Sequence, residues 1–443
     1  MKLPPQPKGL PISGHFKYFR TDPIQFMLNT ADTYEDIALF KLFNKKIYFI
    51  NHPDYIEHVL QKNYKNYHKS PGYKPIQLLG GMGIFTTDGE EWLRRRKFYQ
   101  PAFTNSSIQS YTSTVVDNSN IMLGDWDKQA NKGQKVNVSM EMTKITMSII
   151  SETLFSLRIE FGTELWENTS YALSWLGKRV LKTPFVMPVK WPSKQNRKFH
   201  AAIASLDKLV YDIISSKEEK NENPEDLLSR FMNPEDEKLK PFTAKELRDE
   251  VMTIFIAGHE TSANVLAWAF YKLASLPDIQ EKVYQEVSAL GDKELKFEDM
   301  HDLPYTIQVL SETMRMYPPV WHMGRMNLEE DEIGGYVIPK GSHVRLSPLA
   351  LHRSKNYWDD PHTFNPDRFE TEKAKQQTPF TYIPFGAGPR LCAGRNFAMM
   401  EMVLILAKTI RQYKLSYSGP EVEMAPLMTL RSKGDIFLDI SQR

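Results

Sequence analysis

The sequence predicts a single, mainly α-helical domain with a small β portion. Helix-type apolar spacing dominates from about residue 52 to residue 288, and one apolar pattern runs unbroken from Thr243 to Pro277. Strand-like pieces are few and short. No internal repeat or flexible linker divides the 443 residues. We therefore expect one domain, residues 1–443, with a β-rich N-terminal part of about residues 1–60 and a helix-rich part of about residues 61–443.

The N-terminal part begins with a proline-rich stretch that should be extended, because proline fixes φ and disfavours helix before it. Residues 37–43 and 46–51 follow as two predicted strands. Asn44 and Lys45 are the expected hairpin turn between them. Polar stretches around residues 68–89 and 216–240 interrupt the helical pattern that comes next.

The longest predicted helix starts near Thr243, since Thr243 and Glu246 have the spacing of a capping box. Running to Pro277, it would be about 45–50 Å long, enough to cross a domain. A second helix is expected after Pro277. Short strands follow at residues 335–338 and 344–348, and a last apolar helix should run from just after Cys392 to about Tyr413.

Composition excludes several classes of protein. The chain is 41% hydrophobic and 25% charged, which is typical of a folded globular protein, and its net charge of +2 gives no indication of nucleic-acid binding. The N-terminus has no apolar run that could anchor it in a membrane, and a single cysteine cannot form an internal disulfide. These features predict a cytoplasmic monomer without a membrane segment.

The single cysteine lies in the segment Phe385-Gly386-Ala387-Gly388-Pro389-Arg390-Leu391-Cys392-Ala393-Gly394. A thiolate that binds iron needs backbone N–H donors nearby, a helix N-terminus pointing at it and shielding from water. The glycines allow a tight loop around the sulfur, and the helix after Cys392 would direct its positive end toward it. For a lone cysteine the alternative is a buried structural thiol in a glycine-rich turn.

The complete pattern Phe-x-x-Gly-x-Arg-x-Cys-x-Gly resembles the heme-binding loop of the cytochrome P-450 family. The resemblance implies the cytochrome P-450 fold, with the long central helix lying across a heme b (iron protoporphyrin IX). It also implies that Cys392 is the iron ligand and that Phe385, Arg390 and Gly394 help to hold the heme.

Other motifs of that family occur in the expected order. Glu312 and Arg315 match a Glu-x-x-Arg pair, which with Arg368 should form a buried ion-pair triad; on spacing alone, Glu312 and Arg315 would be an ordinary surface pair. The family's propionate-binding positions correspond to three further residues of this chain: Trp92, Arg96 and Arg325.

The long helix contains Ala257-Gly258-His259-Glu260-Thr261, which is similar to the family's oxygen-activation motif. The resemblance implies that Gly258 leaves room for O₂, that Thr261 hydrogen-bonds it and that Glu260 relays protons from solvent. The alternative for Thr261 is a hydrogen bond to the carbonyl one turn back. His259 occupies a variable position of the motif and is not expected to bind iron.

Possession of both Glu260 and Thr261 favours an O₂-dependent monooxygenase over a heme-based sensor or a peroxygenase. Because the sequence shows no flavin or iron–sulfur segment, electrons are expected from a ferredoxin and its NAD(P)H-dependent reductase. The basic run Arg94-Arg95-Arg96-Lys97 is a candidate ferredoxin docking site. The same run is equally well explained as a solvated helix face.

The substrate is left open. The segments that contact substrate in this family correspond to residues 68–87, 173–190, 320–323 and 426–430, in which lysines are expected to face solvent. In composition the chain resembles family members that demethylate 6-O-methyl-galactose with release of formaldehyde. The alternative is hydroxylation of a fatty acid or a terpenoid. The candidate contacts are Tyr73, Phe85, Trp321, His322 and Met428.

Overall fold

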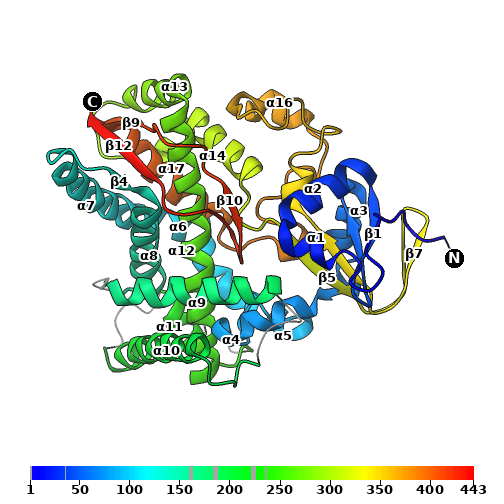
Figure 1. Cartoon of the computed structure of the whole chain (residues 1–443). Coiled ribbons are helices and arrows are strands. Elements are labelled where there is room, and N and C mark those ends of the chain that lie inside the picture. The colour runs from blue at the N-terminus through cyan, green and yellow to red at the C-terminus, as the bar shows by residue number, and fades with distance from the viewer. Residues whose placement is uncertain are drawn as a thin grey trace.

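The computed structural model describes residues 2–34, 36–158, 163–182, 188–220, 226–234, 236 and 238–443. Helices make up most of the molecule, and a smaller β-rich part lies at one side of them (Figure 1). The predicted substrate segment 173–190 therefore lies partly outside the described residues, because residues 183–187 are not among them.

The described α-helices are α1 Phe16–Thr21, α2 Pro23–Tyr34, α3 Pro53–Glu57, α4 Gln77–Gly80, α5 Gly89–Tyr99, α6 Asn105–Ser110, α7 Thr112–Ala130, α8 Val138–Phe155, α9 Thr163–Lys182, α10 Lys194–Lys220, α11 Leu227–Met232, α12 Ala244–Ser275, α13 Pro277–Ser288, α14 Pro304–Met316, α15 Pro348–Leu351, α16 Thr371–Gln376 and α17 Arg395–Gln412. Short 3₁₀ or π turns are η1 His58–Lys62, η2 Tyr64–Asn66, η3 Pro71–Ile76, η4 Pro101–Phe103, η5 Glu298–Asp302, η6 Pro366–Phe369 and η7 Gly388–Arg390. The strands are β1 Ile37–Leu42, β2 Lys45–Ile50, β3 Tyr67–Lys69, β4 Val136–Asn137, β5 Met323–Asn327, β6 Asp331–Ile333, β7 Tyr336–Ile338, β8 His343–Leu346, β9 Tyr413–Ser416, β10 Met424–Pro426, β11 Leu430–Ser432 and β12 Phe437–Gln442.

The predicted hairpin is present, but its turn lies one residue earlier than expected. Leu42 pairs with Lys45, so Phe43 and Asn44 form the turn. Phe43 adopts a left-handed conformation with φ of 56°, which is unusual for a bulky residue. Its ring contacts Phe16 of α1 with 4.8 Å between centroids, and this packing offsets the backbone strain.

The main sheet has the strand order β1-β2-β8-β5-β3. Its strands β8 and β5 come from residues beyond 320, and β8 pairs in parallel with β2. The β-rich part of about residues 1–60 therefore shares its sheet with strands from beyond residue 320. The sheet is completed by a distant segment because β2 needs a hydrogen-bonding partner on its second edge.

Helix α12 confirms the predicted long helix. Thr243 and Glu246 form the full capping box, and the 32-residue helix ends just before Pro277. At about 1.5 Å per residue it is roughly 48 Å long, and it runs through the middle of the helical part, next to α8 (Figure 1). The predicted helix after Pro277 is α13, and the last apolar helix, α17, starts at Arg395.

Candidate functional site

The loop before Cys392 is closed by its own backbone. The Cys392 N–H donates to the Phe385 carbonyl over 3.0 Å. Gly386 and Gly388 have φ of 73° and 66°, and a Cβ at Gly388 would lie 2.0 Å from the carbonyl oxygen of Leu60. Only glycine fits there without moving the backbone. Gly394 has an ordinary φ of −85° and serves instead as the N-cap of α17.

Opposing effects act on the pKa of the Cys392 thiol. The side chain is accessible, yet burial raises the pKa of the thiol, and a backbone N–H of Gly394 together with the charge of Arg96 opposes this shift. A thiol that is both accessible and deep in the molecule faces an internal space. The N–H donor and the positive charge beside it favour the thiolate, as a metal-bound sulfur requires.

Cationic side chains gather next to this loop. Arg390 forms an ion pair with Asp88 at 2.5 Å, and its guanidinium lies over the Trp92 ring at 4.6 Å. Lys69 and Arg325 lie near Arg390. The charge of Arg325 lowers the pKa of Arg390, and the charges of Arg390 and Arg325 lower the pKa of Lys69. Within the described residues, Asp88 is the carboxylate that pairs with this group. The excess of positive charge suits the two propionates of a heme.

Lys69 was expected to face solvent, but it is half-buried and its ammonium group is bonded inside the molecule. Its Nζ donates to the carbonyls of Ile84 and Thr87 at 3.1 and 2.9 Å. Burial, together with the charges of Arg390 and Arg325, holds the pKa of Lys69 well below its usual range. The sequence signal that could have found it is weak: one lysine in the polar stretch of residues 68–89.

The residues of the expected triad are brought together. Arg315 and Glu312 are both fully buried and share two hydrogen bonds of 2.6 and 2.8 Å. Nε of Arg368 lies 3.6 Å from the Glu312 carboxylate. Arg315 also donates to the carbonyls of His352 and Pro361 at 2.7 and 2.9 Å. The surface-pair explanation is thus wrong for this pair.

The middle of α12 differs in detail from the expectation. A Cβ at Gly258 would lie 2.7 Å from Cδ1 of Ile150 in α8, so the glycine makes room for that helix. Ala257 is the exposed position of this stretch. The hydroxyl of Thr261, one turn further on, donates to the Ala257 carbonyl over 2.8 Å. Thr261 therefore has the back-bonded conformation, on the same side of the helix as Ala257.

Glu260 points elsewhere, toward the strand β11. Its carboxylate accepts hydrogen bonds from Thr429 and Arg431, the latter with an ion-pair distance of 2.6 Å. It lines a pocket of about 250 Å³ between α8, α9, α12 and the 427–435 segment. His259 is buried, and Nδ1 of its ring bonds the Phe255 carbonyl one turn back in the same helix.

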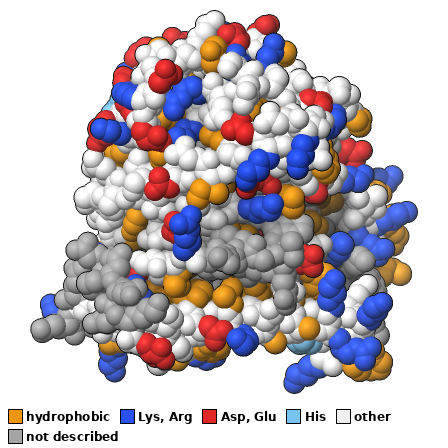
Figure 2. Space-filling model, turned by 90° about the vertical axis from the view of Figure 1, so that its left-hand side faces the viewer, with side chains coloured by type: hydrophobic (Ala, Val, Ile, Leu, Met, Phe, Trp, Pro, Cys, Tyr) orange, Lys and Arg blue, Asp and Glu red, His pale blue; other side chains and the backbone are white. Residues whose placement is uncertain are grey.

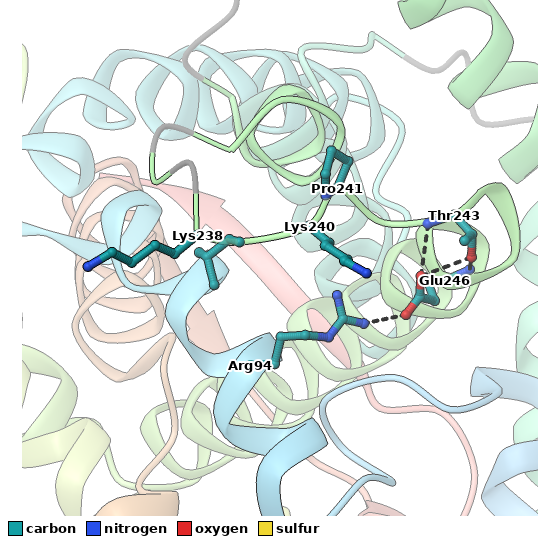
Figure 3. Close-up of a pocket in the computed structure, with 7 residues that line it drawn as sticks. Arg94, Lys238, Lys240, Pro241, Thr243 and Glu246 are labelled. Carbon is teal, nitrogen blue, oxygen red and sulfur yellow. Dashed lines mark hydrogen bonds and ion pairs between the residues drawn. The ribbon is translucent and has the colours of Figure 1, made fainter.

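The basic run of α5 is mostly neutralised inside the molecule. Arg94 pairs with Glu246 at the start of α12 (Figure 3), and Arg95 is 3% exposed and pairs with Glu250. The side chain of Arg96 is directed toward Cys392 closely enough for their charges to interact. Lys97 is left as the exposed cation of the four. The run is therefore not a fully solvated helix face, and of its four cations Lys97 is the one exposed to a docking partner.

The loop before α5 is fastened to α12, which the sequence did not indicate. Asp249 accepts from the Met82 N–H at 2.9 Å, and Glu250 accepts from the Ile84 N–H at 3.1 Å. Gly81 has φ of 56°, and a Cβ there would lie 1.9 Å from Asp249. These contacts fix the loop that presents Phe85.

The five candidate substrate contacts are not equivalent. Phe85 is 39% exposed, and its ring lies 5.6 Å from that of Tyr73. Trp321 is 1% exposed and donates its indole N–H to the Leu427 carbonyl at 3.1 Å, so it supports the late turn. Met428 is half-buried in that turn, which packs on Gly177 of α9. His322 is half-buried, and its Nδ1 has no partner among the described residues.

Comparison with known proteins agrees with this geometry. The family model described as Cytochrome P450 matches residues 4–437. Cyclooctat-9-en-7-ol 5-monooxygenase of Streptomyces melanosporofaciens is 30% identical over 92% of this chain and 88% of its own length. Cytokinin hydroxylase of Arabidopsis thaliana is 31% identical over 80% of this chain and 70% of its own. The crystal structure of the cytochrome P450DA heme domain superimposes with a TM-score of 0.90 at 26% identity, covering 100% of this chain and 98% of that one.

This chain belongs to the cytochrome P450 family and has the cytochrome P450 fold. Membership implies a monooxygenase with a heme-iron cofactor and O₂ as cosubstrate. The accessible thiol of Cys392 and the surplus of cations around Arg390 fit such a group. Across the described residues, no helix is both long and apolar enough to cross a membrane.

Proposed function

We propose that this protein is a heme-thiolate monooxygenase that hydroxylates a lipophilic substrate and uses Cys392 as the iron ligand. The observation that carries the proposal is the Cys392 loop. The thiol is accessible at the N-terminus of α17, and Gly388 closes the loop at a position where no other residue fits. A buried structural cysteine would need neither the accessible sulfur nor the positive charge of Arg96 beside it.

When bound, heme b supplies the binding and reduction of O₂ that insertion of oxygen into a C–H bond requires. The residues of this chain would hold and tune it. The Gly394 N–H and Arg96 stabilise the thiolate form of Cys392. Arg325 and Arg390, with Lys69 added by the structure, would neutralise the propionates while Trp92 packs under Arg390. Phe385 closes the loop through its carbonyl.

Proton delivery would fall to Thr261 and Glu260. The Thr261 hydroxyl, now bonded to the Ala257 carbonyl, can rotate about χ1 to donate toward a ligand beside that turn. Glu260 lines the 250 Å³ pocket and can take up protons there when its contact with Arg431 loosens. Gly258, by admitting Ile150, keeps α8 against this part of α12.

Electrons are proposed to come from a ferredoxin and its NAD(P)H-dependent reductase. Two exposed cations would contribute to docking: Lys97 on α5 and Arg395 at the start of α17, three residues after Cys392. Because Arg94 and Arg95 are engaged with α12, the docking charge is smaller than the sequence indicated.

Hydroxylation is favoured over demethylation of 6-O-methyl-galactose. Two relatives are named for oxygenating cyclooctat-9-en-7-ol and for hydroxylating cytokinin, and neither name involves a methyl ether or a sugar. The exposed aromatic ring of Phe85 also suits an apolar ligand. O-demethylation of the sugar remains the second candidate, since the same oxygen insertion at a methyl ether would release formaldehyde.

The test begins with the reduced CO complex of the purified holoprotein. The wild type should show the thiolate-type Soret band, and Cys392→Ser should lose it while Gly124→Ala, an exposed helix position far from the loop in sequence, keeps it. Retention of the band in Cys392→Ser would refute the assignment.

Substrate class is then tested by titrating the ferric protein with dodecanoic acid, a terpenoid alcohol and 6-O-methyl-galactose. We expect a saturable high-spin shift with a lipophilic compound and none with the sugar. The reverse result would establish the sugar as the ligand. Turnover with ferredoxin and NAD(P)H that exceeds peroxide-supported turnover distinguishes a monooxygenase from a peroxygenase, and absence of both would indicate a sensor.

For Thr261, replacement by Val keeps the shape and removes the hydroxyl. If Thr261 hydrogen-bonds the bound oxygen, product formed per NAD(P)H should fall by about tenfold or more, with the electrons recovered as hydrogen peroxide. Thr261→Ser should retain most of the coupling. If Thr261→Val and the wild type form the same amount of product per NAD(P)H, the Thr261 hydroxyl serves only in its hydrogen bond to the Ala257 carbonyl.

A further inference from the structure

Arg345 is a half-buried cation that has no counter-charge among the residues that the structure describes. It lies on β8, a central strand of the sheet, directly opposite Gly324 of β5. Its guanidinium lies over the Phe19 ring at 4.9 Å. No acidic side chain among the described residues forms an ion pair with it, and its Nη1 is buried without a hydrogen-bond partner. A guanidinium nitrogen that is buried without a partner is costly unless an acceptor reaches it.

Two other polar groups lie around Arg345. His322 and Tyr73 are both near enough to interact electrostatically with it. Nδ1 of His322 is a second buried atom without a partner in the part of the chain that the structure describes. Two unpartnered polar groups at one place indicate that a ligand supplies their missing hydrogen bonds.

Gly324 explains how these groups come together. A Cβ at Gly324 would lie 2.4 Å from the Ser70 hydroxyl and 3.8 Å from Cε2 of Tyr73. The missing side chain therefore lets the turn η3, which carries Tyr73, pack directly on the sheet. Tyr73 in turn contacts Phe85, whose ring is exposed. The polar group thus adjoins the apolar surface proposed to receive substrate.

Arg345 is separate from the cations assigned to the heme propionates. Residues paired across strands point to one face of a sheet, and successive residues alternate. Arg345 pairs with Gly324, so it lies on the opposite face from Arg325. Val344 and Leu346, its neighbours on β8, pack with Leu60 against the side of the sheet that meets the Cys392 loop.

The charge state of the group is positive at neutral pH. Burial lowers the pKa of Arg345 to about 10, so the guanidinium stays protonated. Burial and the charge of Arg345 hold the pKa of His322 well below its usual range, so the imidazole is neutral and has one N–H to donate. The group offers a guanidinium fork, an imidazole N–H and a phenol O–H, which together match a carboxylate.

We infer that Arg345, His322 and Tyr73 form a subsite that binds the carboxylate of an acidic lipophilic substrate. The inference rests on the proposed function and narrows its substrate class from lipophilic compounds in general to those with a carboxylate. The apolar remainder of such a substrate would extend past Phe85.

The experiment uses ω-(imidazol-1-yl)alkanoic acids of six to twelve carbons and the matching ω-(imidazol-1-yl)alkan-1-ols. Their imidazole ligates the heme iron and shifts the Soret band to the red, so the acid and the alcohol of each length report their affinities in the same way. At the chain length that spans the distance from iron to Arg345, the acid should bind about tenfold more tightly than the alcohol or better, as expected for a charge-assisted hydrogen bond.

Arg345→Met should reduce the acid-to-alcohol ratio of affinities to about one while leaving the affinity for the alcohol unchanged. Arg345→Lys should retain part of the preference, and Lys46→Met, which removes an exposed charge from the same sheet, should retain all of it. His322→Phe should weaken the acid selectively.

Equal affinity of acid and alcohol at every chain length in the wild type would overturn the inference, and so would a preference that survives in Arg345→Met. Loss of heme from Arg345→Met would also overturn it, because Arg345 would then serve a propionate. Failure of the proposed function is recognised separately: free imidazole would then produce no red shift of a thiolate-ligated Soret band in the wild type.

Discussion

Glu401 of α17 is a carboxyl group buried completely in the helical core. Neither of its oxygens makes a hydrogen bond of ordinary geometry. Burial raises the pKa of Glu401 to about 8, and the neighbouring Ser262 of α12 opposes the shift only in part. The folded protein therefore carries this group protonated at neutral pH, whereas the unfolded chain carries it ionised.

A pH-dependent stability follows from Glu401. Between about pH 4.5 and pH 8 the folded state binds one more proton than the unfolded state, so stability should fall as pH rises, by up to about 1.4 kcal/mol per pH unit. Glu401→Gln should remove this decline and stabilise the protein at pH 8. Denaturant unfolding at pH 5.5, 6.5 and 7.5 measures the slope. Glu330→Gln, at an exposed position, is the control; an unchanged slope in Glu401→Gln would contradict the assignment.

Two ion pairs with the same helical spacing should differ widely in energy. Glu312 and Arg315 are both 0% exposed, whereas Glu372 and Lys375 are 75% and 65% exposed. Glu312→Gln leaves a buried guanidinium without its charge partner and should cost about 3–5 kcal/mol. Glu372→Gln should change the free energy of unfolding by less than about 0.5 kcal/mol. Similar losses of unfolding free energy in the two variants would show that burial does not determine how much the Glu312–Arg315 pair stabilises the protein.

At the scale of elements, a glycine in α7 and a glycine in the Cys392 loop should respond in opposite ways to replacement by alanine. Gly124 is an exposed helix-interior residue whose Cβ would meet nothing within 4 Å. Gly124→Ala should stabilise the protein by about 0.5–1 kcal/mol, because alanine loses less backbone entropy on folding. Gly388→Ala must instead displace the backbone at Leu60 and should destabilise by about 3 kcal/mol or more.

These two variants are checked by chemical denaturation, with heme content as a second reading. We expect Gly124→Ala to bind heme as the wild type does and Gly388→Ala to bind little. A Gly388→Ala variant of normal stability and heme content would mean that the loop can shift away from η1 without penalty.

Several elements could be foreseen from sequence because their signals are local. The capping box of Thr243 and Glu246 fixes the start of α12, and Pro277 fixes its end. The Cys392 loop is likewise specified by closely spaced glycines. The turn at Phe43 was missed because a distant contact with Phe16 stabilises a conformation that Phe43 would not favour alone.

At the scale of the whole molecule, basic and acidic residues nearly balance, with 56 Lys and Arg against 54 Asp and Glu. The net charge is +2, and acidic and basic side chains are interspersed over the face shown in Figure 2. Attraction of an acidic partner must therefore depend on a few local cations, and the long-range field contributes little.

Single exposed cations should therefore affect the rate at which the proposed ferredoxin reduces this protein. Replacing Lys97 and Arg395 together by Glu should lower the second-order rate of reduction by an acidic [2Fe–2S] ferredoxin about tenfold at low ionic strength, and the difference should vanish near 0.5 M salt. Arg94→Gln should leave the rate nearly unchanged, since Arg94 is paired with Glu246. Stopped-flow reduction under CO measures the rates; a salt-independent loss, or none, would place docking elsewhere.

The sequence by itself determined the family, the Cys392 loop proposed to bind iron, the long helix α12 and the pairing of Glu312 with Arg315, because each depends on residues close together in the chain. The tertiary structure decided which charges are free. Folding pairs Arg94 and Arg95 with α12, bonds the Lys69 ammonium inside the molecule and packs Gly258 against Ile150 of α8. It leaves Arg345 without a counter-ion among the described residues. The reason is physical: the energy of a charge depends on its burial and on partners that folding brings from distant segments.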